Sequence, residues 1–516
     1  MENIFSEKVL YSIGLVLLGV YLVSLVMIFL FSLAQVNLLY NFLRAKRRKD
    51  TSEKFDLSNP NEVPFVTIQL PVYNELYVME RLLDTIVKLE YPSDKIEFQV
   101  LDDSTDESVV STKIQIERLQ KEGHNIQYIH RTDRKGFKAG ALKEGMEVAK
   151  GEFIAIFDAD FLPNSDWLQK TVPYFKNNEV GVVQTRWGHI NRDYSLLTKI
   201  QAFALDAHFT LEQVGRNSQG HFINFNGTAG IWRKDCILDA GNWEGDTLTE
   251  DLDLSYRAQL KNWKFKYLCE VETPAELPVV ISAARSQQFR WNKGGAENFQ
   301  KMIKKVLSSE QISKKTKFHA VLHLLNSTMF LNVFIVGVLS VPMLYLKNYF
   351  SDLKFYFIAL SFFVLSTVFF FICYWFMYKE IKGGGVKKFG GYTVMFFRFF
   401  SVAMGFSLHN SLAVAEGHAG KKSEFVRTPK FNMLSLKDKW SKNKYLQKKL
   451  PKSVFVEGLL ALYFAFGMLS AVFVGYIGEG KTEPSEHFDF GLFPFHLMLF
   501  FGFSYVFYHS IRSVNE

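Results

Sequence analysis

Two pairs of carboxylates follow apolar runs that are rich in strand-forming residues. Asp102 and Asp103 come after FQVL, and Asp158 and Asp160 come after FIAIF. Ligands bind outside the carboxyl ends of the strands in open α/β sheets, so we expect the two pairs to converge. Side chains at positions i and i+2 of an extended segment share a face, and such carboxylates can hold a hard cation together with diphosphate oxygens. The sequence therefore predicts a site for a divalent metal, Mg²⁺ or Mn²⁺, and a diphosphate.

Each pair also has a simpler interpretation. An isolated Asp-Ala-Asp is usually a solvated turn, and Asp102 or Asp103 would cap a helix that begins near Asp106. The metal site is favoured because a buried-strand pattern precedes Asp158 and a second acidic pair follows another such strand. Capping accounts for one acidic residue better than for two in succession.

A basic, glycine-rich stretch from Lys135 to Gly140 precedes a helical run and includes Lys138. Its cations and glycines lie where a helix N-terminus can meet a diphosphate, although an ordinary basic loop explains the stretch equally well. No G-x-G-x-x-G follows the first strand and no G-x-x-x-x-G-K-[ST] occurs, so the phosphate cradles of dinucleotide and P-loop enzymes are missing.

The run TLTEDLDLSYRAQL has apolar residues at helical spacing and an acidic first turn that contains Glu250, Asp251 and Asp253. These residues fit an ordinary helix start. They also fit a catalytic base, because sugar transfer with inversion needs a carboxylate that takes the proton of the acceptor hydroxyl while a metal stabilises the leaving diphosphate. Asp251 is the residue that we expect to act as this base.

A third polar stretch, QQFRWNKG, joins Gln287, Arg290 and Trp291 just before the most apolar part of the chain. The cation and the indole would serve as a membrane-interface anchor. An indole face is also a stacking surface for a sugar ring, so a binding role stays open.

The residues from Pro64 to about Gly241 should form the scaffold that positions these groups. Apolar runs of the strand type alternate there with helical runs, which is typical of a mainly parallel α/β sheet flanked by helices. The expected strands are VTIQL, FQVLD, IQYIH, FIAIFDAD, VGVVQT and FINFNGTAGIW.

The composition limits the class of protein. The chain has 516 residues, 48% of them apolar, which allows one soluble domain and a membrane part. The net charge of +8 comes from blocks of Lys and Arg beside apolar stretches, as membrane flanks do, so nucleic acid is not an expected partner. Only three cysteines occur, without a CxxC pair, so neither a disulfide framework nor a zinc site is indicated.

Five stretches of roughly 20 apolar residues are predicted to span a membrane. The first is not a cleaved signal peptide, because no positive n-region precedes it and the basic run RAKRRK follows it. The charges place its N-terminus outside, residues 36–318 in the cytosol and the acidic loop 478–490 outside. The predicted spans are 9–35, 319–346, 353–378, 453–477 and 491–511.

A sixth apolar stretch, 391–415, has basic residues on both sides and polar residues within it, so we expect a helix in the cytosolic membrane interface. The basic residues that follow it include Lys421, Lys422, Arg427 and Lys430. The predicted organisation is an anchor at 1–40, an α/β domain at 41–318, a helix pair at 319–378, a membrane-face region at 379–452 and a second helix pair at 453–516.

Seven motifs in order resemble the processive family 2 glycosyltransferases, and among them the plant cellulose-synthase-like mannan and xyloglucan-backbone synthases. The motifs are LPVYNE, LDDSTDES, RKGFKAGAL, FDADF, FNGTAGIWR, TLTEDLDL and QQFRW, spread over about residues 60–305, and the stretch SLHNSLAVAEGHAGKKSEFVRTPKF is also similar to the membrane-face region of those enzymes. The resemblance implies a GT-A fold inserted between transmembrane helices.

The resemblance also implies roles for individual residues. Tyr73, Glu75 and Asp103 would contact the nucleotide, with Asp102 in support and Lys138 on the diphosphate. Asp158 and Asp160 would bind the metal and the nucleotide sugar, and Asp251 would be the general base next to the substrate-binding Glu250. Gln287, Arg290 and Trp291 would bind the diphosphate and the acceptor end of the glycan, and Asn226 and Gly227 would shape the acceptor mouth.

Three functions follow as alternatives. The leading hypothesis is an inverting, processive hexosyltransferase that extends a β-1,4-linked glycan from UDP-glucose or GDP-mannose and interacts with membrane lipids. A non-processive transferase acting on a lipid such as ceramide or diacylglycerol would use the same site. A silent nucleotide-sugar-binding or transport protein would not need the base. A bacterial inner membrane is favoured over a Golgi membrane as the location.

Overall fold

The structure is a computed structural model that describes residues 2–48, 50–433, 438, 440, 443–446, 450–474 and 488–515. The chain forms two compact units. The first, here called the helical unit, comprises Met1–Asn37, Leu325–Glu416 and Gln447–Glu516. The second, here called the sheet unit, comprises Leu38–Leu324 and Gly417–Leu446, so it is built from two separate stretches of the chain.

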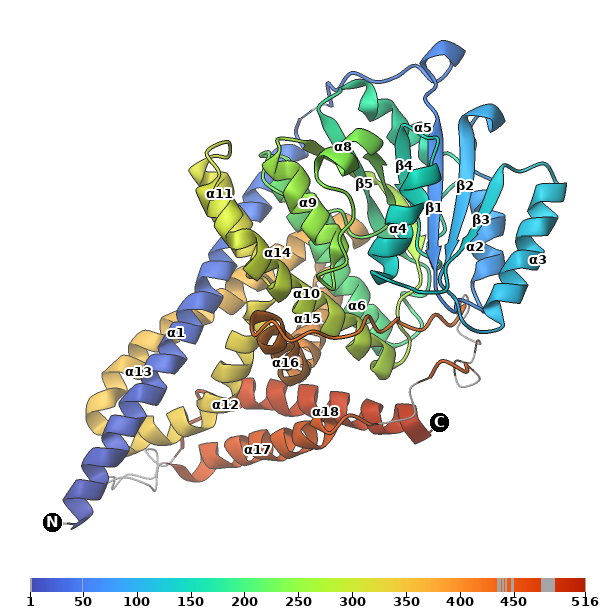
Figure 1. Ribbon diagram of the computed structural model, residues 1–516. Helices are drawn as coiled ribbons and strands as arrows, with labels where there is room; N and C mark the ends of the chain where they lie inside the picture. The colour runs from blue at the N-terminus through green and yellow to red at the C-terminus, as the bar shows by residue number, and fades with distance from the viewer. Residues whose placement is uncertain are drawn as a thin grey trace. The chain divides into compact units, whose positions relative to one another are not determined.

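The sheet unit contains a seven-stranded sheet in the order β3-β2-β1-β4-β6-β5-β7 (Figure 1). Of these strands only β6 runs antiparallel to its neighbours, and the remaining pairs are parallel. The predicted α/β fold with a mainly parallel sheet is confirmed. The strands are β1 (Val66–Val72), β2 (Ile96–Asp102), β3 (Ile126–His130), β4 (Phe153–Ile156), β5 (Val180–His189), β6 (Gly230–Arg233) and β7 (Lys264–Ala275).

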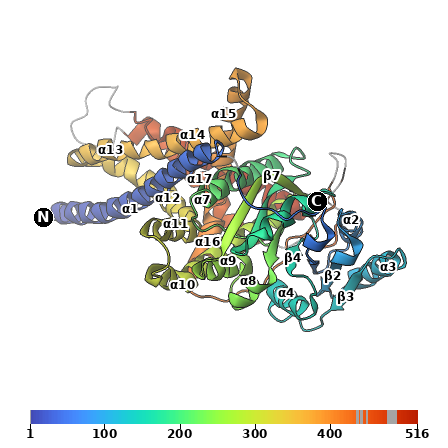
Figure 2. The same cartoon turned by 90° about the horizontal axis from the view of Figure 1, so that it is seen from above.

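Helices cover both faces of the sheet because the apolar side chains of the central strands are buried on both sides. On one face, Val66, Ile68 and Leu70 of β1 join a core with α2 (Met79–Ile86), α3 (Ser108–Lys121) and α5 (Trp167–Thr171). On the other face, Ile154 and Ile156 of β4 pack with α4 (Phe137–Val148), α8 (Lys234–Asp239) and α9 (Glu250–Leu260). Figure 2 shows α2 and α4 on opposite sides of β2.

Two details of the predicted sheet are wrong. Only the last three residues of the run FINFNGTAGIW, 230–232, belong to a strand, β6, because Gly227 (φ +78°) and Ala229 (φ +55°) turn the chain before it. β4 ends at Ile156, so Asp158 and Asp160 lie in the segment beyond it. A further strand, β7, lies at the sheet edge and is not among the predicted strands.

Four helices of the described residues are long and apolar enough to cross a membrane: Glu7–Ala45, Thr328–Tyr349, Ser351–Lys382 and Ser453–Phe473. The first is the apolar length of α1 (Glu2–Ala45), the second is α12, the third includes α14 (Leu365–Lys382) and the fourth is α17. The predicted span at 319–346 begins instead at Thr328, because Lys314–Leu324 forms the separate helix α11 of the sheet unit. The stretch 491–511 lies in α18 (Phe493–Asn515), which packs along α17 but is not among these four helices.

The stretch 391–415 forms α15 (Val386–Gly405) and α16 (Ser407–His418), which meet at an angle of 51°. Together they are apolar enough for a broken span or a re-entrant loop. The interfacial helix therefore stays a prediction. Residues 478–487 of the predicted outer loop, 478–490, lie outside the described residues.

Candidate active site

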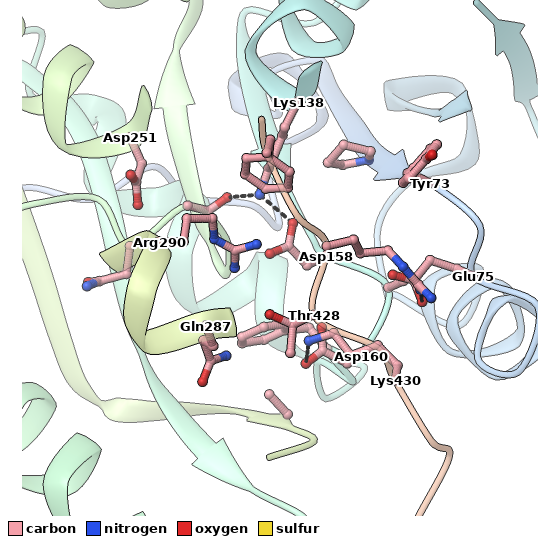
Figure 3. Close-up of a pocket in the computed structure, with 18 of the residues that line it drawn as sticks. Tyr73, Glu75, Lys138, Asp158, Asp160, Asp251, Gln287, Arg290, Thr428 and Lys430 are labelled. Carbon is pink, nitrogen blue, oxygen red and sulfur yellow. Dashed lines mark hydrogen bonds and ion pairs between the residues drawn. The ribbon is translucent and has the colours of Figure 1, made fainter. Parts of the chain in front are cut away.

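A cavity of the sheet unit lies at the carboxyl ends of β1 and β4, where the sequence places it. Every predicted site residue except Asp102 lines this cavity, so Asp103, the second acidic pair and the later motifs do converge. The lining includes Tyr73, Glu75, Asp103, Lys138, Asp158, Asp160, Asn226, Gly227, Glu250, Asp251, Gln287, Arg290 and Trp291. In Figure 3, Tyr73 and Glu75 lie on one side of Asp158, and Asp251 lies on the other.

Asp158 is fixed at the middle of the cavity by its neighbours. Its backbone N–H donates to Thr228 Oγ1 at 2.8 Å, and its carboxylate accepts a hydrogen bond from Lys138 Nζ. Lys138, in the first turn of α4, also donates to the Gly227 carbonyl at 2.9 Å. Burial opposes the charge of Lys138, but the carboxylates of Asp158 and Glu250 raise its pKa. A cation therefore stands beside the metal motif, where a diphosphate would bind.

Asp160 has the environment of a metal ligand that is not fully satisfied. Its side chain is buried, and Oδ2 contacts Lys430 Nζ at 2.6 Å. Oδ1 has no hydrogen-bond partner among the described residues, although buried polar atoms are normally paired. Asp158 and Asp160 present hard carboxylate oxygens, which Mg²⁺ and Mn²⁺ prefer. The residues present therefore fit a divalent cation.

The end of the cavity that the resemblance predicts to hold the nucleotide, here called the nucleotide end, rests on the carboxyl end of β2. Arg131 holds Asp103 in a two-point ion pair, with Nε–Oδ1 at 2.7 Å and NH2–Oδ2 at 2.6 Å. Asp102 is fully buried and accepts hydrogen bonds from Ser104 N–H and the Tyr128 hydroxyl, both at 2.8 Å. Asp102 thus shapes the loop that follows β2. It does not line the cavity.

Residues 421–433, here called the strap, bring a second set of cations to the cavity. Arg427 contacts Glu75 Oε2 at 2.7 Å, and burial raises the pKa of Glu75 to about 7 although Arg427 opposes the shift. Phe431 N–H donates to the buried Glu276 Oε1 at 2.9 Å, which anchors the strap. Figure 3 shows Thr428 and Lys430 of the strap against Asp160.

The prediction that Arg427 and Lys430 are membrane-flanking charges is wrong for these two residues. Both pair with buried carboxylates of the cavity. The basic and aromatic pattern EFVRTPK was the only signal that could have revealed them. Arg134, also missed, stacks on the Tyr73 ring with its guanidinium carbon 3.4 Å from the ring centroid.

Asp251 occupies the end of the cavity opposite the nucleotide end. It lies in the first turn of α9, and its Oδ2 lies 3.2 Å from the position that a Cβ at Gly227 would take. Burial, and then the charge of Glu250, raises the pKa of Asp251 to about 7. Burial likewise raises the pKa of Glu250. A carboxylate with a pKa near neutrality is suited to act as a general base.

The third motif lies on α10 (Ile281–Ser308). Gln287, Arg290 and Trp291 are three and four residues apart, so they share one face of the helix. Arg290 lies over the Phe425 ring of the strap, 4.6 Å from its centroid, and burial lowers its pKa. The side chain of Asn226 is held by Gln213, whose Nε2 donates to Asn226 Oδ1 at 2.8 Å.

Comparison with known proteins identifies the family of the domain that carries most of this cavity. Residues 64–294 match the family described as "Glycosyltransferase like family 2". Residues 64–294 are a family 2 glycosyltransferase domain. The predicted GT-A fold is confirmed as well. Among solved structures, the mannosyltransferase PcManGT from Pyrobaculum calidifontis, in complex with GDP-Man and Mn²⁺, has a TM-score of 0.50 and 18% identity and covers 80% of this chain and 100% of that one.

Plant proteins are similar to this glycosyltransferase domain at higher identity. Glucomannan 4-beta-mannosyltransferase 1 of Oryza sativa subsp. japonica is 44% identical over 263 residues, which are 50% of this chain and 50% of the relative. Glucomannan 4-beta-mannosyltransferase 9 of Arabidopsis thaliana is 43% identical over 282 residues, 54% of this chain and 53% of the relative. The chain thus spans about half the length of these relatives.

Proposed function

We propose that this protein is a membrane-bound inverting glycosyltransferase that transfers a hexose from a nucleotide sugar to a growing β-1,4-linked glycan. The observation that carries the proposal is the position of Asp251, a carboxylate with a pKa of about 7 that lines the same cavity as Asp158 and Asp160. A protein that only bound or transported the nucleotide sugar would not need such a base.

The donor is bound between the nucleotide end and the metal motif. Tyr73, Glu75 and Asp103 line the cavity where the nucleoside would lie, with Asp102 supporting the loop. Lys138 and Arg290 supply positive charge for the diphosphate. Asp158 and Asp160 would hold Mg²⁺ or Mn²⁺, which neutralises charge that develops on the leaving diphosphate.

The acceptor approaches from the side of Asp251. Asp251 removes the proton of the acceptor hydroxyl as its oxygen bonds to the anomeric carbon, and the bond to the diphosphate breaks on the opposite side. Attack from the side opposite the leaving group inverts the configuration at that carbon. Gln287 and Trp291 on α10, together with Asn226 and Gly227, form the walls that orient the acceptor. Glu250 is buried beside the base, and its charge raises the pKa of Asp251.

UDP-glucose and GDP-mannose are the two donors to be distinguished. The names of the plant relatives favour mannose. The four apolar helices favour a membrane location, whereas the plant origin of the relatives gives no support to a bacterial inner membrane. The proposal also includes processive growth of the glycan, in which each transfer is coupled to translocation of the chain.

One experiment tests the proposal as a whole. Purified protein in lipid is incubated with Mg²⁺ or Mn²⁺ and labelled UDP- and GDP-sugars, and the product is sized and digested with linkage-specific hydrolases. A polymer cut by β-1,4-specific enzymes is expected, and its synthesis should stop with EDTA and resume with added metal. A lipid-sized product would replace the polymer hypothesis with transfer to a lipid such as ceramide or diacylglycerol, and no sugar transfer at all would refute the proposal.

A further inference from the structure

Arg134 is the first residue of the motif RKGFKAGAL and has no predicted role, yet it lines the cavity beside Tyr73. Its guanidinium carbon lies 3.4 Å from the centroid of the Tyr73 ring. This separation is van der Waals contact, so no guanidinium nitrogen can point at the ring and the planar group must lie flat on it. The stack therefore fixes the plane in which Arg134 can donate hydrogen bonds.

The backbone of Arg134 is held in a conformation that few L-residues adopt. Its φ is +46°, and that of Phe137 is +51°. Strain of this kind persists only where the surrounding structure enforces it, and it gathers at ligand sites. Here Arg131 enforces it, because its NH1 donates to the Lys135 carbonyl at 3.1 Å and its NH2 donates to the Phe137 carbonyl at 2.9 Å. The turn that carries Arg134 is thus fixed in place.

The guanidinium of Arg134 is free to bind a ligand. Within the part of the chain that the structure describes, it makes no hydrogen bond and no ion pair. Its Nε is buried without a partner, whereas its two terminal nitrogens are not among the buried atoms. The carboxylates of the nucleotide end have other cations as partners, since Glu75 pairs with Arg427 and Asp103 pairs with Arg131. Arg134 therefore presents free N–H donors at the cavity.

The order of groups in a nucleotide sugar decides which part of it meets these donors. The proposed function places the diphosphate at Asp158 and the sugar on the side of Asp251, where the acceptor attacks the anomeric carbon. Tyr73 lies on the other side of Asp158 (Figure 3). The nucleoside is joined to the diphosphate at the end away from the sugar, so it extends toward Tyr73 and Arg134.

A flat, unpaired guanidinium at this place suits the edge of a purine base. The planar group can donate two parallel hydrogen bonds to two acceptors on one edge, and guanine offers such a pair in O6 and N7. Uracil offers a single acceptor, O4, on the corresponding edge. We propose that Arg134 selects a guanine nucleotide by donating from its two terminal nitrogens to O6 and N7 of the base, so that the sugar donor is a GDP-sugar.

This inference rests on the proposed function, and nucleotide binding to the whole protein in lipid tests it without turnover. The Kd values of GDP, UDP and 7-deaza-GDP are measured with Mg²⁺ or Mn²⁺ for the wild type, Arg134→Met and Lys135→Met. Arg134→Met keeps an unbranched stem and removes every donor, whereas 7-deaza-GDP lacks only the N7 acceptor. Lys135→Met is the matched control, because it removes the neighbouring positive charge from an exposed residue outside the cavity lining.

The wild type should bind GDP at least about tenfold more tightly than UDP, as a two-point base contact implies. It should bind GDP about fivefold more tightly than 7-deaza-GDP, as the loss of one hydrogen bond implies. Arg134→Met should lose both preferences and keep the Kd of UDP within about twofold of the wild type. Lys135→Met should keep both preferences. The comparison of GDP with 7-deaza-GDP in the wild type needs no variant, so it tests the base contact even if Arg134→Met does not fold.

Three results would overturn base selection and leave the proposed function standing. They are an unchanged Kd of GDP in Arg134→Met, an equal weakening of GDP and UDP in that variant, which would assign Arg134 to the diphosphate, and a wild type that binds UDP or 7-deaza-GDP as tightly as GDP. A wild-type protein that binds no nucleoside diphosphate and turns over no nucleotide sugar refutes the proposed function, and base selection with it.

Discussion

The substitution Asp251→Asn is the sharpest test of the site, because Asn keeps the shape of the side chain and cannot take a proton. Asp251 Oδ1 accepts a hydrogen bond from Leu252 N–H at 2.9 Å, and the amide oxygen of Asn can accept the same bond. We therefore expect the fold and donor binding to survive, with the donor Kd within about twofold of the wild type.

The magnitude follows from the role of the base and from its pKa. Positioned general bases contribute roughly 10²- to 10⁴-fold to a rate, so kcat should fall at least about a hundredfold in Asp251→Asn. In the wild type the base must be ionised, and its pKa is about 7. The rate should therefore rise with pH and level off above neutrality, and at pH 6 it should be roughly a tenth of the plateau, as one titrating group requires.

The assay is initial-rate sugar transfer at saturating donor between pH 5.5 and 8.5, run on the wild type, Asp251→Asn and Glu250→Gln. Because the charge of Glu250 raises the pKa of Asp251, Glu250→Gln should move the rising limb of the profile to lower pH. A pH-independent wild-type rate, or an Asp251→Asn protein that keeps more than about a tenth of the wild-type kcat, would refute the assignment of the base.

Two further substitutions have matched controls elsewhere in the sheet unit. Arg131→Ala leaves the buried Asp103 without its ion-pair partner, so we expect a loss of about 3–5 kcal/mol in stability, measured by denaturant unfolding, and weak nucleotide binding. Arg118→Ala removes an exposed ion pair and should leave the unfolding midpoint unchanged; equal effects would contradict the assignment. Gly227→Ala forces a Cβ at φ +78° to within 3.2 Å of Asp251 Oδ2 and should reduce transfer at least about tenfold, measured as kcat. Gly123→Ala has the same backbone strain at φ +92° with no atom within 4 Å, and a comparable loss of kcat there would show that strain alone explains the result.

The parts of the site that the sequence predicts well are those determined locally. Asp158 and Asp160 follow a short apolar run that could only be a buried strand, and the end of a parallel strand fixes where they lie. Asp251 opens an amphipathic helix, so its place in the first turn follows from spacing alone. The apolar length of a membrane helix is likewise a property of composition, which is why most of the predicted spans correspond to long helices.

The parts that could not be predicted depend on contacts between distant stretches. Lys430 and Asp160 are 270 residues apart in the chain, and no local pattern distinguishes a Lys that pairs with a buried carboxylate from one that flanks a membrane. Trp187, at the carboxyl end of β5, lines the cavity next to a shift in the pairing of β5 with β7 at Thr185, and such a register change has no signature in either strand. The irregular path of 222–229 depends on two residues with positive φ, one of which, Ala229, is not a glycine.

The division of the sheet unit into two stretches of chain affects the order in which the protein can fold. Residues 325–416, which belong to the helical unit, are synthesised between Leu324 and the strap. At roughly 5–20 residues per second, Arg427 and Lys430 emerge from the ribosome roughly 7–28 s after Trp291, the last residue of the cavity lining before the strap. During that interval Glu75 and Asp160 lack the cations that later pair with them. The nascent domain must therefore persist with an incomplete, negatively charged pocket while the intervening helices of the helical unit are synthesised.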